Sequence, residues 1–358
     1  MTSSTLTSQE RFRRMFEHRE ADRIPVVDYP WGATIERWQR EGMPAEVSYV
    51  DFFGLDRVAH IGVNNGPRWQ TETIAETEEY TIVKTDWGAT LRNWKHVAST
   101  PEFLDFTVKD RDSWATAKAR MTMAHDRVDW AYLKKAYPTW RRDGCWIQAG
   151  GWFGFDITHS WFVGTETVLM AMIEDPEWLV EMWQTELELN LALLDLVWDA
   201  GYTFDSLNWP DDMGYKLNQF FSLATYRALL KPIHQRAIAW AHAKGVKAHL
   251  HSCGDIRPFV PELVEIGLDA LNPLEVKAGM DPLLLKAQFG AQLALHGGIN
   301  AVLWDDISAI ETEMRLVVPT LKTGGGYIFS SDHSVPSSVS LDNFRYIVNL
   351  AKDLGRYT

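Results

Sequence analysis

The chain has 358 residues, of which 46% are hydrophobic and 23% charged, a balance typical of a globular protein with a large core. Its formal net charge is −13, and no stretch is strongly basic. Nucleic-acid binding needs a cationic face that displaces counterions, so the composition disfavours this class of partner.

The N-terminal residues and the cysteines indicate the compartment. The first residues, MTSSTLTSQERFRRMF, lack the apolar core of a signal peptide, and no run of 18 apolar residues predicts a membrane span. The two cysteines, Cys145 and Cys253, do not suggest a disulfide framework, so we expect a cytoplasmic protein. The 17 tryptophans are a large number and favour a tryptophan-lined pocket for an aromatic or apolar ligand.

The first third of the chain predicts a helix, two strands and a hairpin. Residues 7–10, TSQE, match a capping box that opens a helix within residues 1–22. Strands are predicted at RIPVVDYP and DRVAHIGVNN. Within an expected insertion over about 66–143, the stretch EYTIVKTDWGATLRNW alternates like a hairpin, and residues 101–143 have a polar, helical pattern.

Strands and helices alternate regularly from residue 145 onward. The predicted strands are CWIQAGGW, FDSLNWPDD, VKAHLHSCG, DALNPLE, LALHGGIN and GYIFSSDH, and the predicted helices are 165–200, 222–244, 257–266, 281–289, 305–322 and 341–354. With the two early strands, this order is typical of a parallel sheet of eight strands. We therefore expect an α/β protein, a (β/α)8 TIM barrel with an N-terminal helical and hairpin extension, as a single domain over 1–358.

Polar side chains follow most of the predicted strands. In a parallel barrel the active site lies at the carboxyl ends of the strands. The side chains there are Asp28, Asn64, Asn65, Asn208, Asp211, Asp212, His251, Cys253, Asn272, Glu275, His296, Asn300, Asp332 and His333. Their accumulation at one rim predicts a functional site, because a purely structural barrel would not require it.

The stretch VKAHLHSC carries the most specific signal. Side chains of a strand alternate between its faces, so Lys247, His249, His251 and Cys253 share the face that points into the barrel. Two histidines and a thiol make a poor hydrocarbon core but a good donor set for zinc. A buried cysteine beside a hydrogen-bonded histidine is the competing interpretation.

Two further donors complete a tetrahedral zinc site. Glu275 ends the next strand and His333 ends the last one, so the predicted ligands are His251, Cys253, Glu275 and His333. Glu275 is also a candidate catalytic residue that leaves the metal when substrate arrives. His249 lies deeper and is expected to support the ligands or the core.

Other residues at the rim are candidates for the substrate. Asp212 is predicted to be catalytic, as an acid or a partner of a substrate hydroxyl, and its competing interpretation is a helix cap. The predicted substrate contacts are Trp31, Trp152, Asn208, Asp211 and Tyr215. For the two tryptophans, core packing is an equally good interpretation.

These motifs resemble the uroporphyrinogen decarboxylase superfamily, and within it the zinc-containing methyltransferases of corrinoid systems. The resemblance runs from TSQERFRRMFEHREADRIPV to the last residues, with DDMGYK, HSCGD, NPLE and HGGIN in the expected order. It implies zinc bound at His251 and Cys253 and a further ligand near the end of the eighth strand. The chain departs from the related zinc sites at His333, where a cysteine is usual.

The resemblance implies a zinc-dependent methyltransferase that works with a separate corrinoid-binding protein, which carries cobalamin, and with a small-molecule methyl donor or acceptor. A site with one thiolate is a harder Lewis acid than one with two, which favours demethylation of a methoxylated aromatic compound over methylation of a thiol. Three alternatives stay open: a methylcobamide:thiol methyltransferase, a decarboxylase or lyase, and a non-catalytic binding protein. A decarboxylase is disfavoured because DYPWGATIERW, after the first strand, offers no arginine clamp for a polyanion. An oligomer is possible.

Overall fold

The computed structural model describes residues 5–96 and 100–357 of the chain. A curled sheet of seven parallel strands forms its centre, in the order β1-β6-β7-β10-β11-β12-β13. The strands are β1 (Val58–Gly62), β6 (Trp146–Gly150), β7 (Ser206–Pro210), β10 (Lys247–His251), β11 (Ala270–Asn272), β12 (Ala294–His296) and β13 (Tyr327–Ile328). The seven strands follow one another across the sheet in the same order as along the chain. This order is expected for a barrel-like α/β fold.

The first predicted strand, RIPVVDYP, is present only as isolated bridges. Val26 pairs in parallel with Phe329, next to β13. On its other side, the Val26 carbonyl accepts from the Asp56 amide at 2.9 Å, and the Val26 amide donates to the Asp56 carboxylate at 2.8 Å. Pro25 and Pro30 flank this segment and have no N–H to donate, which explains why a regular ladder does not form. The prediction of a regular strand at residues 23–30 was therefore wrong, whereas the seven other predicted strands are confirmed.

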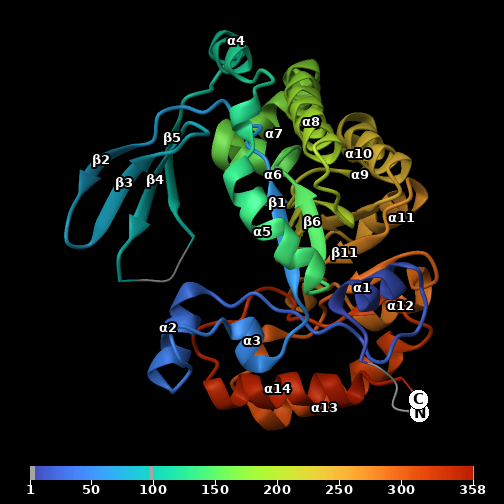
Figure 1. The fold of residues 1–358 in the computed structure, drawn as a ribbon. Helices are drawn as coiled ribbons and strands as arrows, with labels where there is room; N and C mark the ends of the chain where they lie inside the picture. The colour runs from blue at the N-terminus through green and yellow to red at the C-terminus, as the bar shows by residue number, and fades with distance from the viewer. Residues whose placement is uncertain (1–4, 97–99, 358) are drawn as a thin grey trace.

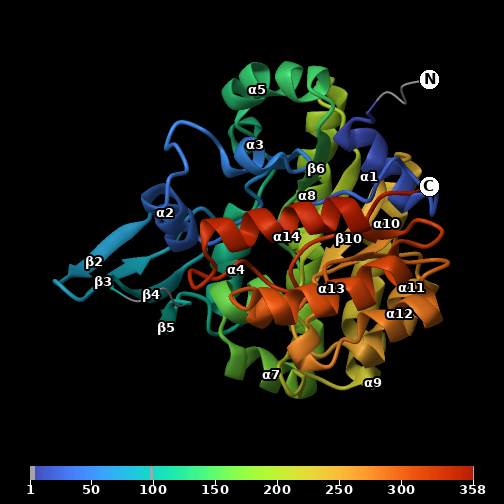
Figure 2. The same ribbon diagram turned by 90° about the horizontal axis from the view of Figure 1, so that it is seen from below.

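Helices surround the sheet (Figure 1). They are α1 (Ser8–Phe16), α2 (Gly32–Arg40), α3 (Tyr49–Phe53), α7 (Thr165–Glu174), α8 (Pro176–Asp199), α10 (Lys231–Ala243), α11 (Val260–Glu265), α12 (Pro282–Phe289), α13 (Ile307–Lys322) and α14 (Leu341–Leu354). Seen from below, α13 and α14 lie side by side across one flank (Figure 2). The predicted capping box at α1 is half present, since Thr7 accepts from the Glu10 amide.

The core forms where the apolar faces of these helices meet the sheet. Helix α8, for example, begins at a proline, which suits the first helical turn, and fully buries Met182, Trp183 and Leu187 at helical spacing. Ala248 and Leu250 of β10 are completely buried on the opposite face from His249 and His251, as the alternation predicted. Each large apolar side chain buried in this way stabilises the fold by about 1.5–3 kcal/mol.

The segment between β1 and β6 forms a separate antiparallel sheet that projects from the barrel (Figure 1). It contains β2 (Glu72–Glu76), β3 (Tyr80–Lys84), β4 (Ala89–Trp94) and β5 (Glu102–Phe106), followed by α4 (Arg111–Arg120) and α5 (Trp130–Arg142). The predicted hairpin corresponds to β3 and β4. The helical pattern predicted from residue 101 was wrong over β5, which pairs with β4 and is exposed at its first four residues, 102–105. The division of the chain into one domain stays a prediction.

Glycine allows the backbones to approach closely at the carboxyl end of β10. A Cβ on Gly254 would lie 2.2 Å from the Gly214 carbonyl carbon, and the residue has a φ of +78°. A side chain at this position would force apart the turn after β10 and the hairpin of β8 (Gly214–Tyr215) and β9 (Asn218–Gln219). This close contact fixes the position of Cys253. No helix in the described part of the chain has the length and apolar character of a membrane span.

Candidate metal centre and substrate cavity

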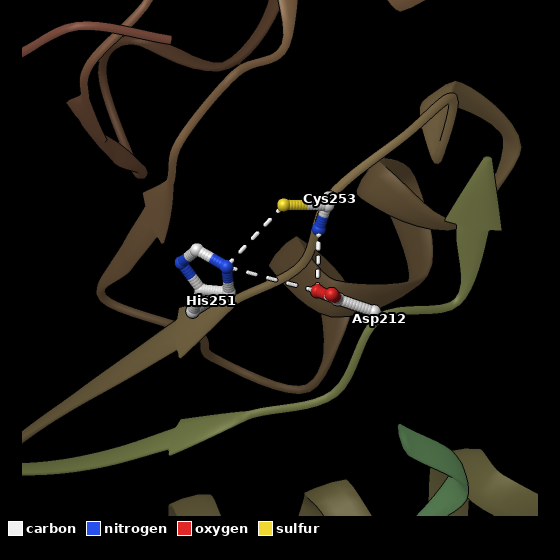
Figure 3. A group of neighbouring side chains, drawn as sticks. All are labelled: Asp212, His251 and Cys253. Carbon is white, nitrogen blue, oxygen red and sulfur yellow. Dashed lines mark hydrogen bonds and ion pairs between the residues drawn. The ribbon is translucent and has the colours of Figure 1, made fainter. Parts of the chain in front are cut away.

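Three side chains with different donor atoms meet after strands β7 and β10 (Figure 3). The Cys253 Sγ lies 3.4 Å from the His251 Nε2, which lies 3.7 Å from an oxygen of Asp212. One ligand atom from each of these residues lies within 4.8 Å of the other two. An imidazole nitrogen, a sulfur and a carboxylate oxygen at this spacing form a donor set that suits zinc.

Asn272 of β11 orients the imidazole of His251. The Asn272 Nδ2 donates to the His296 carbonyl at 3.2 Å, which turns its Oδ1 toward the His251 Nδ1 at 2.7 Å. Because Oδ1 accepts, Nδ1 must carry the ring proton. The lone pair of Nε2 is then directed toward Cys253 and Asp212, as a metal ligand requires. The sequence placed Asn272 at a strand end but gave no sign of this role.

Asp212 belongs to the group through a backbone contact. Its Oδ1 accepts a hydrogen bond from the Cys253 amide at 2.7 Å, which holds the carboxylate beside the thiol. The chain continues from Asp212 into the short strand β8 and not into a helix, so the interpretation of this residue as a helix cap was wrong. Its predicted catalytic role stays a prediction, but the structure adds Asp212 as a candidate ligand that the sequence did not suggest.

Glu275 and His333 lie outside this group of donors. Glu275 is buried, and its two oxygens contact the Gly254 amide at 2.6 Å and the Lys277 Nζ at 3.3 Å. His333 is exposed, with its ring centroid 6.4 Å from that of Trp31. Their roles as ligands, and that of Glu275 in catalysis, stay predictions, whereas His251 and Cys253 do lie together.

The group lies in a strongly acidic environment. Burial raises the pKa of the Cys253 thiol well above its ordinary value, and the charges of Asp212, Glu275 and Asp156 raise it further. The pKa of Asp156 is raised in turn by burial and by the charges of Asp212 and Asp211. A divalent cation would reverse this repulsion and favour the thiolate, so the residues present fit zinc.

Asp211 supports the site from beneath. It is fully buried, and its two oxygens contact the His234 Nε2 at 2.7 Å and accept from the Asp156 amide at 2.7 Å. These contacts connect β7, α10 and the segment that begins with α6 (Phe155–Ile157) and continues as the π-helical turn Thr158–Phe162. The predicted contact of Asp211 with substrate stays a prediction, since both of its oxygens are engaged by the protein in this structure. No motif or spacing in the sequence pointed to Asp156, which lies in α6, in the connection after β6.

Asn208 and His249 form the next layer down in the barrel. The Asn208 Oδ1 accepts from the Ser206 hydroxyl at 2.7 Å, and its Nδ2 donates to the His249 Nδ1 at 2.9 Å. The second ring nitrogen of His249 lies 3.3 Å from the His296 Nδ1. Burial lowers the pKa of His249 to about 3, so this histidine is neutral. It lies below the donor group, as predicted.

A cavity of about 1060 Å³ opens beside the donor group. His251 lies in its wall, together with the predicted substrate residues Trp152 and Asn208. Its other lining residues include His60, Asn64, Asn65, Asp86, Trp87, Asp126, Arg127, Asp129, Trp130, Gln148 and Trp209. The predicted contacts Trp31 and Tyr215 are outside this lining, with 38% and 44% of their surfaces exposed. The cavity joins an aromatic surface to the metal-capable residue His251.

Comparison with known proteins gives a family and a fold. A solved methyltransferase from Methanosarcina mazei is 15% identical and superposes with a TM-score of 0.66, over 97% of this chain and 99% of that one. At this identity the likeness shows the fold alone. No curated protein matches the chain significantly. The family model for uroporphyrinogen decarboxylase (URO-D) matches residues 159–354, more than half of the chain, including all three donor residues. The chain therefore belongs to the uroporphyrinogen decarboxylase family.

Proposed function

We propose that the chain is a zinc-dependent methyltransferase that demethylates a methoxylated aromatic compound and passes the methyl group to the cobalt of a corrinoid held by a partner protein. The observation that carries the proposal is the position of His251, which belongs both to the donor group and to the wall of the aromatic cavity. A methyl ether in the cavity would thus have its oxygen near the metal ligands.

His251, Cys253 and Asp212 would hold the metal. Bound zinc would supply a Lewis acid that stabilises the negative charge of the departing oxygen. In the proposed reaction the bond between the methyl carbon and the ether oxygen would break, the methyl group would pass to the reduced corrinoid of the partner protein, and the oxygen would leave as a phenolate. Asn272 contacts the Nδ1 of His251, which leaves Nε2 facing the donor group, and the Cys253 amide keeps Asp212 in place.

The tryptophans of the cavity would position the ring of the substrate. Trp87 and Trp152 line the cavity, and Trp152 stacks on Trp161 with 5.9 Å between ring centroids. Stacked aromatic side chains present broad apolar surfaces to a planar ligand. The similar fold of the M. mazei protein, which is named a methyltransferase, supports this proposal.

The proposal is tested by methyl transfer in vitro. The purified protein is incubated with 1,2-dimethoxybenzene and chemically reduced cobalamin, and methylcobalamin and the phenol product are measured. We expect both products in equal amounts, and neither from a Cys253→Ala variant. Methyl transfer from methylcobalamin to a thiol, without ether cleavage, would favour the thiol methyltransferase instead. A zinc-containing protein that binds methoxyarenes but transfers no methyl group in either direction would favour the binding protein.

A further inference from the structure

We propose that the cavity selects uncharged aromatic methyl ethers and rejects those that carry a carboxylate. This inference rests on the proposed function and narrows its substrate class. It follows from the hydrogen bonds and charges of the cavity lining, considered one group at a time.

The arginine of the lining is fully used by the protein. Arg127 is only 4% exposed. Its guanidinium donates at 2.6–2.8 Å to four backbone carbonyls, those of Thr122, Asn64, Gly66 and Arg120. These bonds use four of its five N–H groups and tie two loops together. Arg127 therefore cannot form the two parallel bonds by which an arginine recognises a carboxylate.

Apart from Arg127 and the histidines, the ionisable residues of the described lining are all aspartates. Asp126 forms two hydrogen bonds to Arg68, at 2.8 and 2.9 Å, and Asp129 caps α5. Asp86 lies in the turn between β3 and β4, and no described residue pairs with its side chain. A ligand carboxylate would therefore be repelled by the unpaired carboxylate of Asp86. The described lining offers no available lysine or arginine to compensate this repulsion.

The histidines of the lining do not replace a cation. Burial lowers the pKa of His60, so its ring is neutral near pH 7. His251 donates through Nδ1 to Asn272 and directs its Nε2 to the donor group. A carboxylate in the cavity would lose part of its hydration and gain no charged partner, so its binding is disfavoured relative to an uncharged ligand.

Uncharged oxygen atoms find suitable partners in the same cavity. The lining supplies the side-chain amides of Gln148 and Asn64, which are uncharged hydrogen-bond donors. A neutral donor of this kind suits an ether or hydroxyl oxygen. The remaining surface from Trp87 and Trp152 suits the aromatic ring.

Binding of a matched pair of ligands tests the proposal. 1,2-Dimethoxybenzene and 3,4-dimethoxybenzoate are titrated into the protein as purified and after metal removal with a chelator, with tryptophan fluorescence and calorimetry as readouts. We expect the uncharged ether to bind at least about tenfold more tightly to the metal-free protein. Equal or tighter binding of the benzoate to that protein would overturn the proposal, as would the failure of both ligands to bind at millimolar concentration.

The Asp86→Asn variant tests the origin of the selectivity. It removes the unpaired carboxylate, so the ratio of the two affinities should fall by about two- to fivefold, the size expected for one charge in a partly hydrated site. The Asp342→Asn variant, on α14 outside the cavity lining, should leave the ratio unchanged. An unchanged ratio in Asp86→Asn would contradict the role of this residue. Because binding is measured and not turnover, charge selectivity without methyl transfer would overturn only the proposed reaction.

Discussion

Two groups of wholly or partly buried ionisable side chains lie at opposite ends of the parallel strands, and they differ in their balance of charge. At the amino end, Arg11 and Arg23 contact Asp22 and Asp56 at 2.6–2.9 Å. At the carboxyl end, Asp156, Asp212 and Glu275 all raise the pKa of one thiol, Cys253.

The difference separates a structural cluster from a functional one. In the amino-end cluster two acids meet two bases, so every charge is compensated by the protein itself. In the carboxyl-end cluster the acids exceed the bases, and the environment raises the pKa values of Cys253 and Asp156, which disfavours their charged forms. An excess of acidic groups of this kind suits the binding of a positive charge from outside the protein, here a divalent cation. The predictions below change one cluster at a time.

Replacing Cys253 should have the largest effect. A Cys253→Ala variant should lose its zinc and its methyl-transfer activity while staying folded, because the sulfur is one of the donors but lies at the surface of the core. Metal analysis and circular dichroism measure the two properties. The matched control is Cys145→Ala, since Cys145 is buried away from the donor group and should leave the zinc content unchanged. Equal zinc in Cys253→Ala and in the unchanged protein would remove Cys253 from the site.

Changing the amino-end cluster should affect stability and not metal. Asp56 is fully buried between Arg11 and Arg23, so an Asp56→Asn variant leaves buried cations without their partner. We expect the free energy of unfolding to fall by about 3–5 kcal/mol in chemical denaturation. The control Asp51→Asn breaks an exposed pair with Arg57 and should cost less than about 1 kcal/mol. Loss of zinc from folded Asp56→Asn protein would mean that the two clusters are not independent.

The residue that orients His251 should have an intermediate effect. An Asn272→Ala variant removes the acceptor of the Nδ1 proton and should weaken zinc binding about 10- to 100-fold in competition with a chelator. In Asn272→Asp a carboxylate oxygen can accept the same proton, so binding should be largely retained. Similar losses in the two variants would indicate that Asn272 acts by packing and not by fixing the tautomer.

The pH dependence of zinc binding should show the smallest effect. The raised pKa of Cys253 means that the thiol holds its proton at neutral pH in the metal-free protein. Zinc must displace that proton, so the affinity should rise with pH, by up to about tenfold per unit, until the pH passes the raised pKa. Calorimetry in buffers of different ionisation enthalpy would count the protons released. An affinity that does not change between pH 6 and 8 would contradict the raised pKa.

The sequence predicted the parts of this picture that depend on short-range pattern. The alternation along β10 placed His249, His251 and Cys253 on one face, and the alternation of strands with helices predicted the parallel sheet. The sequence wrongly predicted a regular first strand at residues 23–30. The side chain of Asp56 takes the Val26 amide, and two prolines interrupt the ladder, and neither effect follows from the local pattern.

The missed residues of the site depend on contacts across the fold. Asp212 reaches the donor group because the close turn at Gly254 brings the Cys253 amide to it. Asp156 acts on the same thiol from the short helix α6 in the connection after β6, and no spacing in the sequence relates the two. Asn272 gains its role only through the orientation set by the carbonyl of His296.

The metal content of the purified protein, determined by elemental analysis without added metal, tests the central claim most directly. The account predicts about one zinc per chain, lost in Cys253→Ala and retained in Cys145→Ala. A protein that contains no zinc and takes up none on titration would show that the acidic cluster of Asp156, Asp212, Glu275 and Cys253 is not a metal centre.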